Sequence, residues 1–564
     1  MECEIKLAVD ATSAARLKKS AVLREHAVSK PRDQEHVDRY FDTGGFDLWK
    51  HGFALRVRSA GERHVQTLKG GGSAVAGLHR RTELEAEIPS EVPDHDLFDR
   101  QLREALPGLA HSLDGRQLAP EPVFVNRTKR TTWMLALPDG THVECALDVG
   151  ELQHGERKTA VRELELEVKD GDPACLYELA QRVHEATPVR IENISKAERG
   201  YALATDDKAH AVKAAPVTLK RKATLGEALG GILQNCLQQM QANERGVLAG
   251  DVESLHQMRV GLRRLRAAQD MVDGLVTLPE PLAADIDWFA GELGDARNWD
   301  VFLESVLPGL PLTEDQKPSL ARVEAAAREE AERHRARVRS AVGSPRYTTL
   351  MLALGGWIAG KGWHHTALPA DPLEQKIAKA APQLVQHAAA RVRKRARGYD
   401  LKRPECLHKV RIAAKKERYA REFFSALSHD RKATKRHDLL SGMQDELGEI
   451  NDAFVARELV AQLRDRVPQE AGLLGFIEGV LAARAARQGE PACKGTLLNW
   501  CRYVSRPPAP VGRPSRHVLS SLGAMRILTR DCDVIVTARR SPPAAHRSSG
   551  ATGPRAWTNA CLRA

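Results

Sequence analysis

The sequence predicts a multidomain α+β protein in which a strand-rich N-terminal region precedes a long helical region. Residues 1–205 contain short segments in which apolar and polar residues alternate, as they do in half-buried strands. From about residue 219 to residue 505, apolar residues recur every three or four positions, which is typical of amphipathic helices. Two stretches of the helical region also resemble each other at a constant offset, which indicates an internal duplication.

Changes in composition along the chain suggest where the domains begin and end. With 42% hydrophobic and 28% charged residues, the 564-residue chain has enough apolar material for packed cores, which excludes a fully disordered protein. Residues 206–218 are rich in Ala and Lys without periodicity, so we predict a linker there. After residue 505 the chain becomes rich in Arg, Pro and Ser. We therefore predict a strand-rich domain over 1–205, a helical domain over 219–505 and a disordered tail over 506–564.

The charge balance gives little support to nucleic-acid binding. The net charge is +11, but ten arginines against two aspartates in residues 506–564 account for most of the excess. Aromatic residues are only 5% of the chain, so platforms for base stacking are scarce. The nine cysteines are dispersed without a CxxC pair, the chain begins with acids rather than a signal peptide, and no stretch approaches the ~20 apolar residues of a membrane span. We expect a cytoplasmic protein without disulfides.

Charged residues alternate along the predicted strands of the N-terminal region. Glu2, Glu4 and Lys6 share one face of the first strand, because successive side chains of a strand point to opposite sides. The same alternation recurs at Arg56 and Arg58, at Lys69, at Arg81, Glu83 and Glu85, at Glu144 and Asp148, and at Glu163, Glu165 and Glu167. One such face is normally solvent-exposed. Six or more strands that each have a charged face, with acids and bases mixed, favour a closed sheet with a polar interior.

A polar interior of this kind suits a metal–polyphosphate complex. Carboxylates hold hard divalent cations through oxygen, and the cation in turn bridges phosphate oxygens. Arginine and lysine side chains across the interior would clamp the remaining phosphate charge. The strand-rich region is therefore predicted to bind a cation together with a chain of phosphates.

The first strand, Glu2-x-Glu4-x-Lys6, resembles the ExExK signature of the CYTH superfamily, the triphosphate tunnel metalloenzymes. Further matching pieces follow in the expected order, namely Tyr40-Phe41-Asp42-Thr43, Leu55-Arg56-Val57-Arg58, Thr67-Leu68-Lys69, Arg130-Thr-Thr-Trp133 and Ser195-Lys196-x-x-Arg199-Gly-Tyr201. The resemblance covers about 200 residues. It implies an eight-stranded antiparallel tunnel with flanking helices that hydrolyses a triphosphate.

The same resemblance implies roles for individual residues. The divalent metal, Mg²⁺ or Mn²⁺, would be held by Glu2, Glu4 and the strand that carries Glu163, Glu165 and Glu167. Phosphates would be held by Lys6, Arg56, Arg58, Lys69, Arg81, Arg130 and Lys196. The attacking water would be oriented by Glu83, Glu85 or Asp148, with Lys6 also in the catalytic set. Which of the three glutamates at 163, 165 and 167 touches the metal stays open.

The internal repeat of the helical region is built around a histidine and several cations. Leu255–Arg266 resembles Leu407–Arg418 at an offset of 152, and a second shared piece, Leu293–Asn298 and Leu447–Asp452, follows at an offset of 154. On helices, one face of each copy collects a histidine and three cations: His256, Arg259, Arg263 and Arg266, and His408, Arg411, Lys415 and Arg418. Because like charges stacked on one face repel, a polyanion that neutralises both faces is expected.

This repeated motif resembles the CHAD domain, a helical domain with a conserved histidine. The resemblance implies two four-helix bundles related by a pseudo-twofold axis, and it implies binding of inorganic polyphosphate without assigning a reaction. The order of the two domains resembles bacterial inorganic triphosphatases, which implies metal-dependent hydrolysis of tripolyphosphate to pyrophosphate and phosphate, with polyphosphate granules as a candidate location. Two alternatives stay open: a tunnel enzyme for an organic triphosphate (a thiamine triphosphatase or an adenylate cyclase), and a non-catalytic polyphosphate adaptor.

Overall fold

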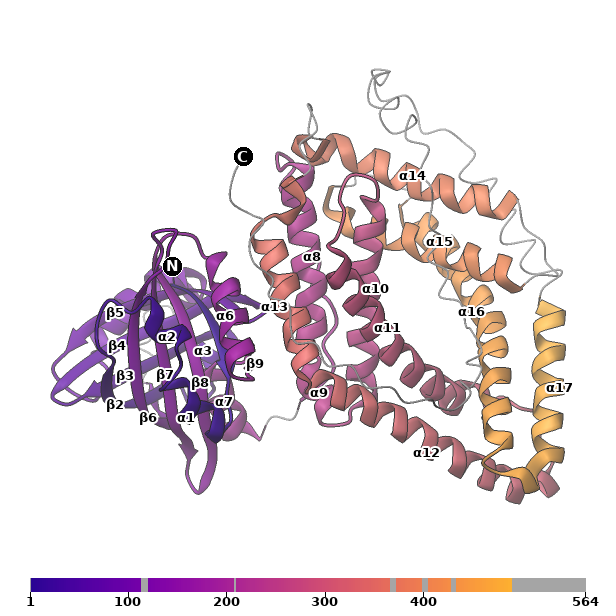
Figure 1. Cartoon of the computed structure of the whole chain (residues 1–564), viewed down its shortest axis with the longest axis horizontal. Coiled ribbons are helices and arrows are strands. Elements are labelled where there is room, and N and C mark those ends of the chain that lie inside the picture. The colour runs from indigo at the N-terminus through magenta and orange to yellow at the C-terminus, as the bar shows by residue number, and fades with distance from the viewer. Residues whose placement is uncertain are drawn as a thin grey trace, which may run out of the picture. The chain divides into compact units, whose positions relative to one another are not determined.

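The computed structural model describes residues 2–112, 120–206, 209–365, 372–397, 404–427 and 433–488 (Figure 1). The predicted tail at 506–564 and the end of the predicted helical domain lie outside these ranges. Within the predicted linker, residues 209–218 form neither helix nor strand. No helix in the described ranges combines the length and the apolar character that crossing a membrane requires.

The N-terminal region forms a closed antiparallel sheet, as predicted. Its eight long strands are β1 (Glu2–Ala8), β2 (Arg32–Asp42), β3 (Phe53–Ala60), β4 (Arg63–Val75), β5 (Leu78–Ile88), β6 (Glu121–Ala136), β7 (His142–His154) and β8 (Arg157–Asp170). They follow the order β5-β4-β3-β2-β6-β7-β8-β1, and pairing of β1 with β5 closes the ring. A two-residue strand, β9 (Arg190–Ile191), pairs with β1 on the outside of this order.

The predicted alternation separates the two faces of the sheet. On β1, Ile5 and Leu7 belong to the hydrophobic core outside the tunnel, and Leu164 and Leu166 of β8 join them there. Seven short helices accompany the strands: α1 (Ala11–Leu17), α2 (Val22–Glu25), α3 (Asp47–Lys50), α4 (His95–Ala105), α5 (Pro107–Ser112), α6 (Cys175–Ala186) and α7 (Lys196–Thr205). Because the apolar side chains pack outward against such helices, the charged side chains are left inside the ring.

Part of the tunnel interior is filled by an apolar cluster. Tyr40 pairs directly with Arg56 and with Phe124 on its two neighbouring strands, so all three side chains share the inner face. The rings of Tyr40 and Phe124 stack with centroids 4.4 Å apart, and Tyr201 of α7 meets Phe124 edge-on at 5.3 Å. Leu152 and Val161 complete this cluster. The helix α7 therefore plugs the interior beside the charged zone.

The helical region is built from two similar sets of four long helices. The first set is α8 (Leu225–Ala242), α10 (Val252–Met271), α11 (Glu280–Val301) and α12 (Lys317–Val342); the second is α14 (Ile377–Arg397), α15 (Pro404–Phe423), α16 (Ala433–Arg464) and α17 (Ala471–Gln488). Corresponding helices begin 152 residues apart for α8/α14 and α10/α15, 153 apart for α11/α16 and 154 apart for α12/α17. The predicted duplication is thus reproduced in the helix order.

Each set repeats the same chain of neighbours. In the first, α8 packs on α10, α10 on α11 and α11 on α12; in the second, α14 packs on α15, α15 on α16 and α16 on α17 (Figure 1). The sets meet where α10 packs on α15 and α11 on α16. The short helix α9 (Glu244–Leu248) and the longer α13 (Pro345–Ala359) stand outside this repeat. The two helices that carry the histidine motif therefore lie side by side.

Candidate functional site

Three carboxylates converge inside the tunnel. Asp148 of β7 stands directly across from Glu163 of β8, and Glu165 follows two residues later on the same face. Each offers one oxygen within 4.8 Å of the others, and all three residues are buried. We call these residues the acidic trio. Their oxygen donors fit a hard divalent cation such as Mg²⁺ or Mn²⁺, which prefers carboxylate ligands.

Four cationic side chains contact the acidic trio. Lys196 Nζ lies 2.7 Å from Asp148 and 2.9 Å from Glu165, and it also contacts Glu163. Arg130 donates two hydrogen bonds to Asp148, at 2.8 and 2.6 Å, and a third to Glu165 at 2.6 Å. Lys6 contacts Glu165, and Arg199 contacts Glu163.

These contacts keep Asp148 and Glu165 ionised although both are buried. Burial alone would raise the pKa of Asp148, but Arg130 and Lys196 outweigh it and hold that pKa at about 2. Burial likewise opposes ionisation of Glu165, while Lys196, Lys6 and Arg130 bring its pKa well below the usual range. Asp148 and Glu165 are therefore negatively charged at neutral pH.

A second group of charges lies around β1, β4 and β5. Lys69 contacts Glu2, and its Nζ lies 3.7 Å from Glu4 and from Glu83. The pKa of Glu2 rises to about 7 through burial and the neighbouring Glu4. Burial also acts on Glu4, but Lys6, 2.9 Å away, lowers its pKa to about 2. The two glutamates of the ExExK signature thus differ in proton affinity.

Other residues predicted for the tunnel site lie further from the acidic trio. Glu85 is exposed and has no ion-pair partner within the described ranges. Glu167 pairs with Lys169 at 2.7 Å, and Arg81 pairs with Glu198 at 3.3 Å. Arg56 lies 3.5 Å from Glu83, while Arg58 belongs to a separate buried cluster. The predicted set therefore divides into the acidic trio with its cations, the β1–β4–β5 group and a more exposed margin.

The sequence analysis missed Asp38, which is fully buried on β2. Arg58 donates two hydrogen bonds to Asp38, at 2.6 and 3.2 Å, and Asn126 donates a third at 3.1 Å. Burial disfavours the carboxylate, yet Arg58 and Arg56 keep the pKa of Asp38 far below its usual range. Strand alternation could have identified Asp38, because it lies two residues before Tyr40 of the motif Tyr40-Phe41-Asp42-Thr43 and therefore on the same face of the strand.

The motif Ser195–Tyr201 has a local physical explanation. Ser195 and Glu198 form a reciprocal capping box that starts α7. From the first turns of this helix, Lys196 and Arg199 reach the acidic trio. Tyr201 donates a hydrogen bond to buried Asp42 at 2.8 Å. The motif therefore fixes where α7 begins, which cations it carries and how it is anchored.

Gly200 lets α7 approach the sheet closely. A Cβ at this position would lie 2.0 Å from the Phe124 ring, far inside van der Waals contact. Gly200→Ala is expected to destabilise the protein by about 1–3 kcal/mol, because the helix and ring must separate. Urea unfolding would measure the loss. Adding Phe124→Leu should restore part of the lost stability. Wild-type stability in Gly200→Ala would contradict this account of α7.

The histidine motifs of the helical region converge on one cavity of about 170 Å³. Its walls come from α10, α11 with the short helix η1 (Phe302–Val306) that follows it, α15 and α16, so both copies of the repeat contribute. Its polar lining consists of His256, Arg259, Arg263, Arg297, Asn298, Arg411, Lys415, Asn451 and Asp452. We call this cavity the cationic pocket.

Three residues of the predicted cationic faces do not line the cationic pocket. Arg266 pairs with Asp287 at 3.0 Å, and the Arg418 guanidinium lies over the Tyr419 ring at 5.2 Å. His408 is exposed and shares a hydrogen bond of 2.8 Å with Asn451, a pocket residue. Sequence reasoning also left out the pocket residues Arg297, Asn298, Asn451 and Asp452, although all four belong to the second shared piece of the repeat.

Electrostatics mark the cationic pocket as a site for an anion. Burial and the neighbouring cations lower the pKa of Arg259 to about 9 and that of Lys415 to about 6. Burial and Arg297 lower the pKa of His256 to about 4, so this histidine is neutral at pH 7. Within the described ranges, no carboxylate lies within 4.0 Å of Arg259, Arg263 or Lys415. Unbalanced positive charge of this kind favours an anionic ligand.

Comparison with known families agrees with both regions. The CYTH domain family matches residues 1–201, and the CHAD domain family matches residues 231–461. The chain contains a CYTH domain over residues 1–201 followed by a CHAD domain over residues 231–461. These assignments confirm the predicted tunnel and helical fold and the resemblance inferred from the two sets of motifs.

Individual relatives match parts of the chain. An inorganic triphosphatase of Haemophilus influenzae is 28% identical over 203 residues, which cover 36% of this chain and 54% of that protein. The chain thus spans about half the length of this curated relative. The CHAD domain from the plant Ricinus communis is 35% identical, with a TM-score of 0.45, over 52% of this chain and 96% of that one. A Hippeastrum protein described as a putative adenylyl cyclase with a dominant triphosphatase activity is 18% identical, with a TM-score of 0.27, over 37% and 97%.

Proposed function

We propose that the CYTH domain hydrolyses inorganic triphosphate to pyrophosphate and phosphate with a divalent cation, and that the CHAD domain binds inorganic polyphosphate. One observation carries the enzymatic part: inside a closed tunnel, three buried carboxylates lie among four cationic side chains. Metal and phosphate ligands are thereby supplied at one place, which phosphoryl transfer requires more than covalent chemistry. The similarity to the Haemophilus inorganic triphosphatase supports the choice of substrate.

We assign the cation, Mg²⁺ or Mn²⁺, to oxygens of Asp148, Glu163 and Glu165, with Glu2 and Glu4 as further candidate ligands. Bound there, a divalent cation would neutralise charge on the phosphate oxygens. Glu167 is the weakest of the predicted ligands, because it pairs with Lys169 at 2.7 Å and lies outside the acidic trio.

The cations of the tunnel would hold the phosphate chain. Lys6, Arg130 and Lys196 border the acidic trio, while Lys69 and Arg56 lie beside Glu83. Arg58 and Arg81 would extend this binding surface from its margins. Among the acids predicted to orient the attacking water, Glu83 is the best placed, because Glu85 is exposed and Asp148 is engaged by Arg130. Positioning and charge neutralisation would then supply most of the rate enhancement.

The test is phosphate release by the purified full chain from tripolyphosphate, ATP and thiamine triphosphate, each with Mg²⁺, with Mn²⁺ and with chelator. We expect metal-dependent release from tripolyphosphate that Glu4→Gln abolishes. Release from an organic triphosphate alone would keep the tunnel chemistry and replace the substrate. No release from any of the three, with polyphosphate still bound, would make the chain a non-catalytic adaptor.

Polyphosphate binding by the cationic pocket should depend on pH through Lys415. Burial and the facing cations Arg411, Arg263 and Arg259, opposed only by Asp452, set its pKa at about 6, so the free side chain is mostly neutral at higher pH. A bound polyanion favours the ammonium form, so binding takes up a proton. Affinity should therefore fall as pH rises above about 6, by up to about tenfold per pH unit.

Calorimetry in two buffers of different ionisation enthalpy would measure this proton uptake. Lys415→Met should flatten the pH dependence, because the titrating group is gone. Lys394→Met, at an exposed lysine of α14, should leave the dependence as in the wild type. An equally steep pH dependence in Lys415→Met would assign the proton uptake to another group.

A further inference from the structure

Two ion bridges join the helices that carry the histidine motif. Arg264 of α10 donates a hydrogen bond to Glu422 of α15 at 2.9 Å. In the opposite direction, Lys416 of α15 contacts Asp270 of α10. Arg264 and Lys416 are 152 residues apart, and so are Asp270 and Glu422. Each bridge is therefore the counterpart of the other under the internal repeat, as in an isologous interface.

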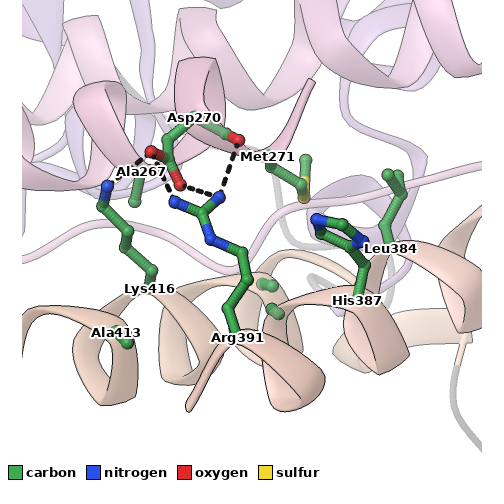
Figure 2. A pocket seen from close by; sticks show the side chains of 10 residues that line it. Ala267, Asp270, Met271, Leu384, His387, Arg391, Ala413 and Lys416 are labelled. Carbon is green, nitrogen blue, oxygen red and sulfur yellow. Dashed lines mark hydrogen bonds and ion pairs between the residues drawn. The ribbon is translucent and has the colours of Figure 1, made fainter. Parts of the chain in front are cut away.

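The surroundings of the two bridges are also related by the repeat. Figure 2 shows Arg391 of α14 and Lys416 converging on Asp270, with Arg391 hydrogen bonds of 2.7 and 3.1 Å. On the other side, Arg264 is almost fully buried and donates a hydrogen bond of 3.0 Å to Gln239 of α8. Gln239 and Arg391 are again 152 residues apart. Both bridges are thus anchored in the first helix of a set.

Each bridge cation follows a cation of the cationic pocket in sequence. Arg263 precedes Arg264, and Lys415 precedes Lys416; the first residue of each pair lines the pocket and the second joins the opposite helix. Consecutive residues of a helix point about 100° apart, which allows this division of roles. The pocket cations of α10 and α15 repel one another across the cavity, and the two bridges supply an attraction between the same helices that offsets this repulsion.

We propose that the two bridges form a clasp that sets the separation of the cationic faces of α10 and α15, which makes Asp270 and Glu422 positioning residues for anion binding. The proposal rests on the proposed binding of polyphosphate in the cationic pocket. Neither acid lines that pocket, so each acts through the placement of Arg259, Arg263, Arg411 and Lys415. If the clasp acts in this way, removing the charge of Asp270 or Glu422 should weaken the binding of polyphosphate, although neither side chain lines the cationic pocket.

The test measures binding of inorganic polyphosphate of defined length to the full chain. Asp270→Asn and Glu422→Gln should each weaken binding about tenfold, because each removes the charge from one bridge. The double variant Asp270→Glu with Lys416→Arg gives the second bridge the chemistry of the first and should bind nearly as the wild type does. Asp285→Asn is the matched control, because Asp285 is about as exposed as Asp270, pairs with Arg346 at 2.7 Å and does not line the cationic pocket.

Tripolyphosphate hydrolysis should be unchanged in all four variants, since none alters the tunnel. Wild-type affinity in Asp270→Asn and Glu422→Gln would overturn the proposal, as would an equal loss in Asp285→Asn. Amide hydrogen exchange gives a readout that needs no ligand, so it separates the clasp from the proposed function. If the wild type binds no polyphosphate, faster exchange in α10 and α15 of Asp270→Asn, with α12 unchanged, would still support the clasp. Unchanged exchange would overturn it.

Discussion

Glu165→Gln is expected to lower metal-dependent phosphate release from tripolyphosphate by about 100-fold or more. Glu165 contacts Lys6, Arg130 and Lys196 and completes the acidic trio, so its charge serves both the metal and the placement of three phosphate-binding cations. Glutamine keeps the shape of the side chain but removes its charge. Steady-state kinetics at saturating substrate and varied Mg²⁺ would measure the loss, and a weaker apparent Mg²⁺ affinity should accompany it.

The matched control is Glu167→Gln, two residues along the same strand face. Glu167 pairs with Lys169 and is more exposed, so its loss should change the rate by less than about tenfold. This pair of variants separates Glu165 from Glu167 as the glutamate of β8 that serves the metal. Equal losses in both variants, or a larger loss in Glu167→Gln, would contradict the assignment of the metal to the acidic trio.

Lys196→Met is expected to destabilise the metal-free protein by about 3 kcal/mol, because removing one partner of a buried ion pair leaves charge uncompensated. The buried Lys196 ammonium contacts all three acids of the trio, and these contacts keep its pKa above the usual value despite burial. Adding Mg²⁺ should restore more stability to the variant than to the wild type, because the metal ion replaces the missing positive charge. Urea unfolding with and without Mg²⁺ measures both effects.

Lys169→Met provides the comparison for this experiment, since Lys169 pairs with Glu167 in a more exposed position. Its stability should change by less than about 1 kcal/mol, and Mg²⁺ should act on it as on the wild type. If Mg²⁺ stabilises Lys196→Met no more than it stabilises the wild type, the acidic trio does not bind the metal.

The strand alternation was sufficient to predict the tunnel but not the grouping of its acids. The two-residue alternation of a strand predicts which side chains point inward. Glu163, Glu165 and Asp148 were all expected inside the tunnel. Their convergence depends on strand register: β7 pairs with β8 so that Asp148 stands opposite Glu163. Register is set by turns and by the packing of both faces, which a single strand does not reveal. Alternation also does not say how near the margin of the sheet a residue lies, and Glu85, one of the acids predicted to orient the water, is exposed.

The helical region shows a related limit. Placing Arg266 and Arg418 on the same face as the histidines assumed that ten residues bring a helix back to its starting direction. At about 100° per residue, position i+10 is turned roughly 80° away from position i. Arg266 accordingly meets Asp287, and Arg418 lies over Tyr419. The pairing of α10 with α15 creates the cationic pocket. Only the internal repeat suggested that these two helices pair, because neither helix sequence alone indicates its neighbour.

The drift of the repeat offset from 152 to 154 has a consequence for how the pocket can diversify. In a dimer of identical chains, every residue of a shared cavity occurs twice, and each substitution is made on both sides at once. Here the two copies share one chain and have become unequal: Asn298 stands in the first copy where Asp452, the one acid among the pocket-lining residues, stands in the second. Because the two copies are joined in one chain, the two walls of the cavity need not carry identical residues. Each wall can change its charge independently, while the paired bridges between α10 and α15 still join the copies.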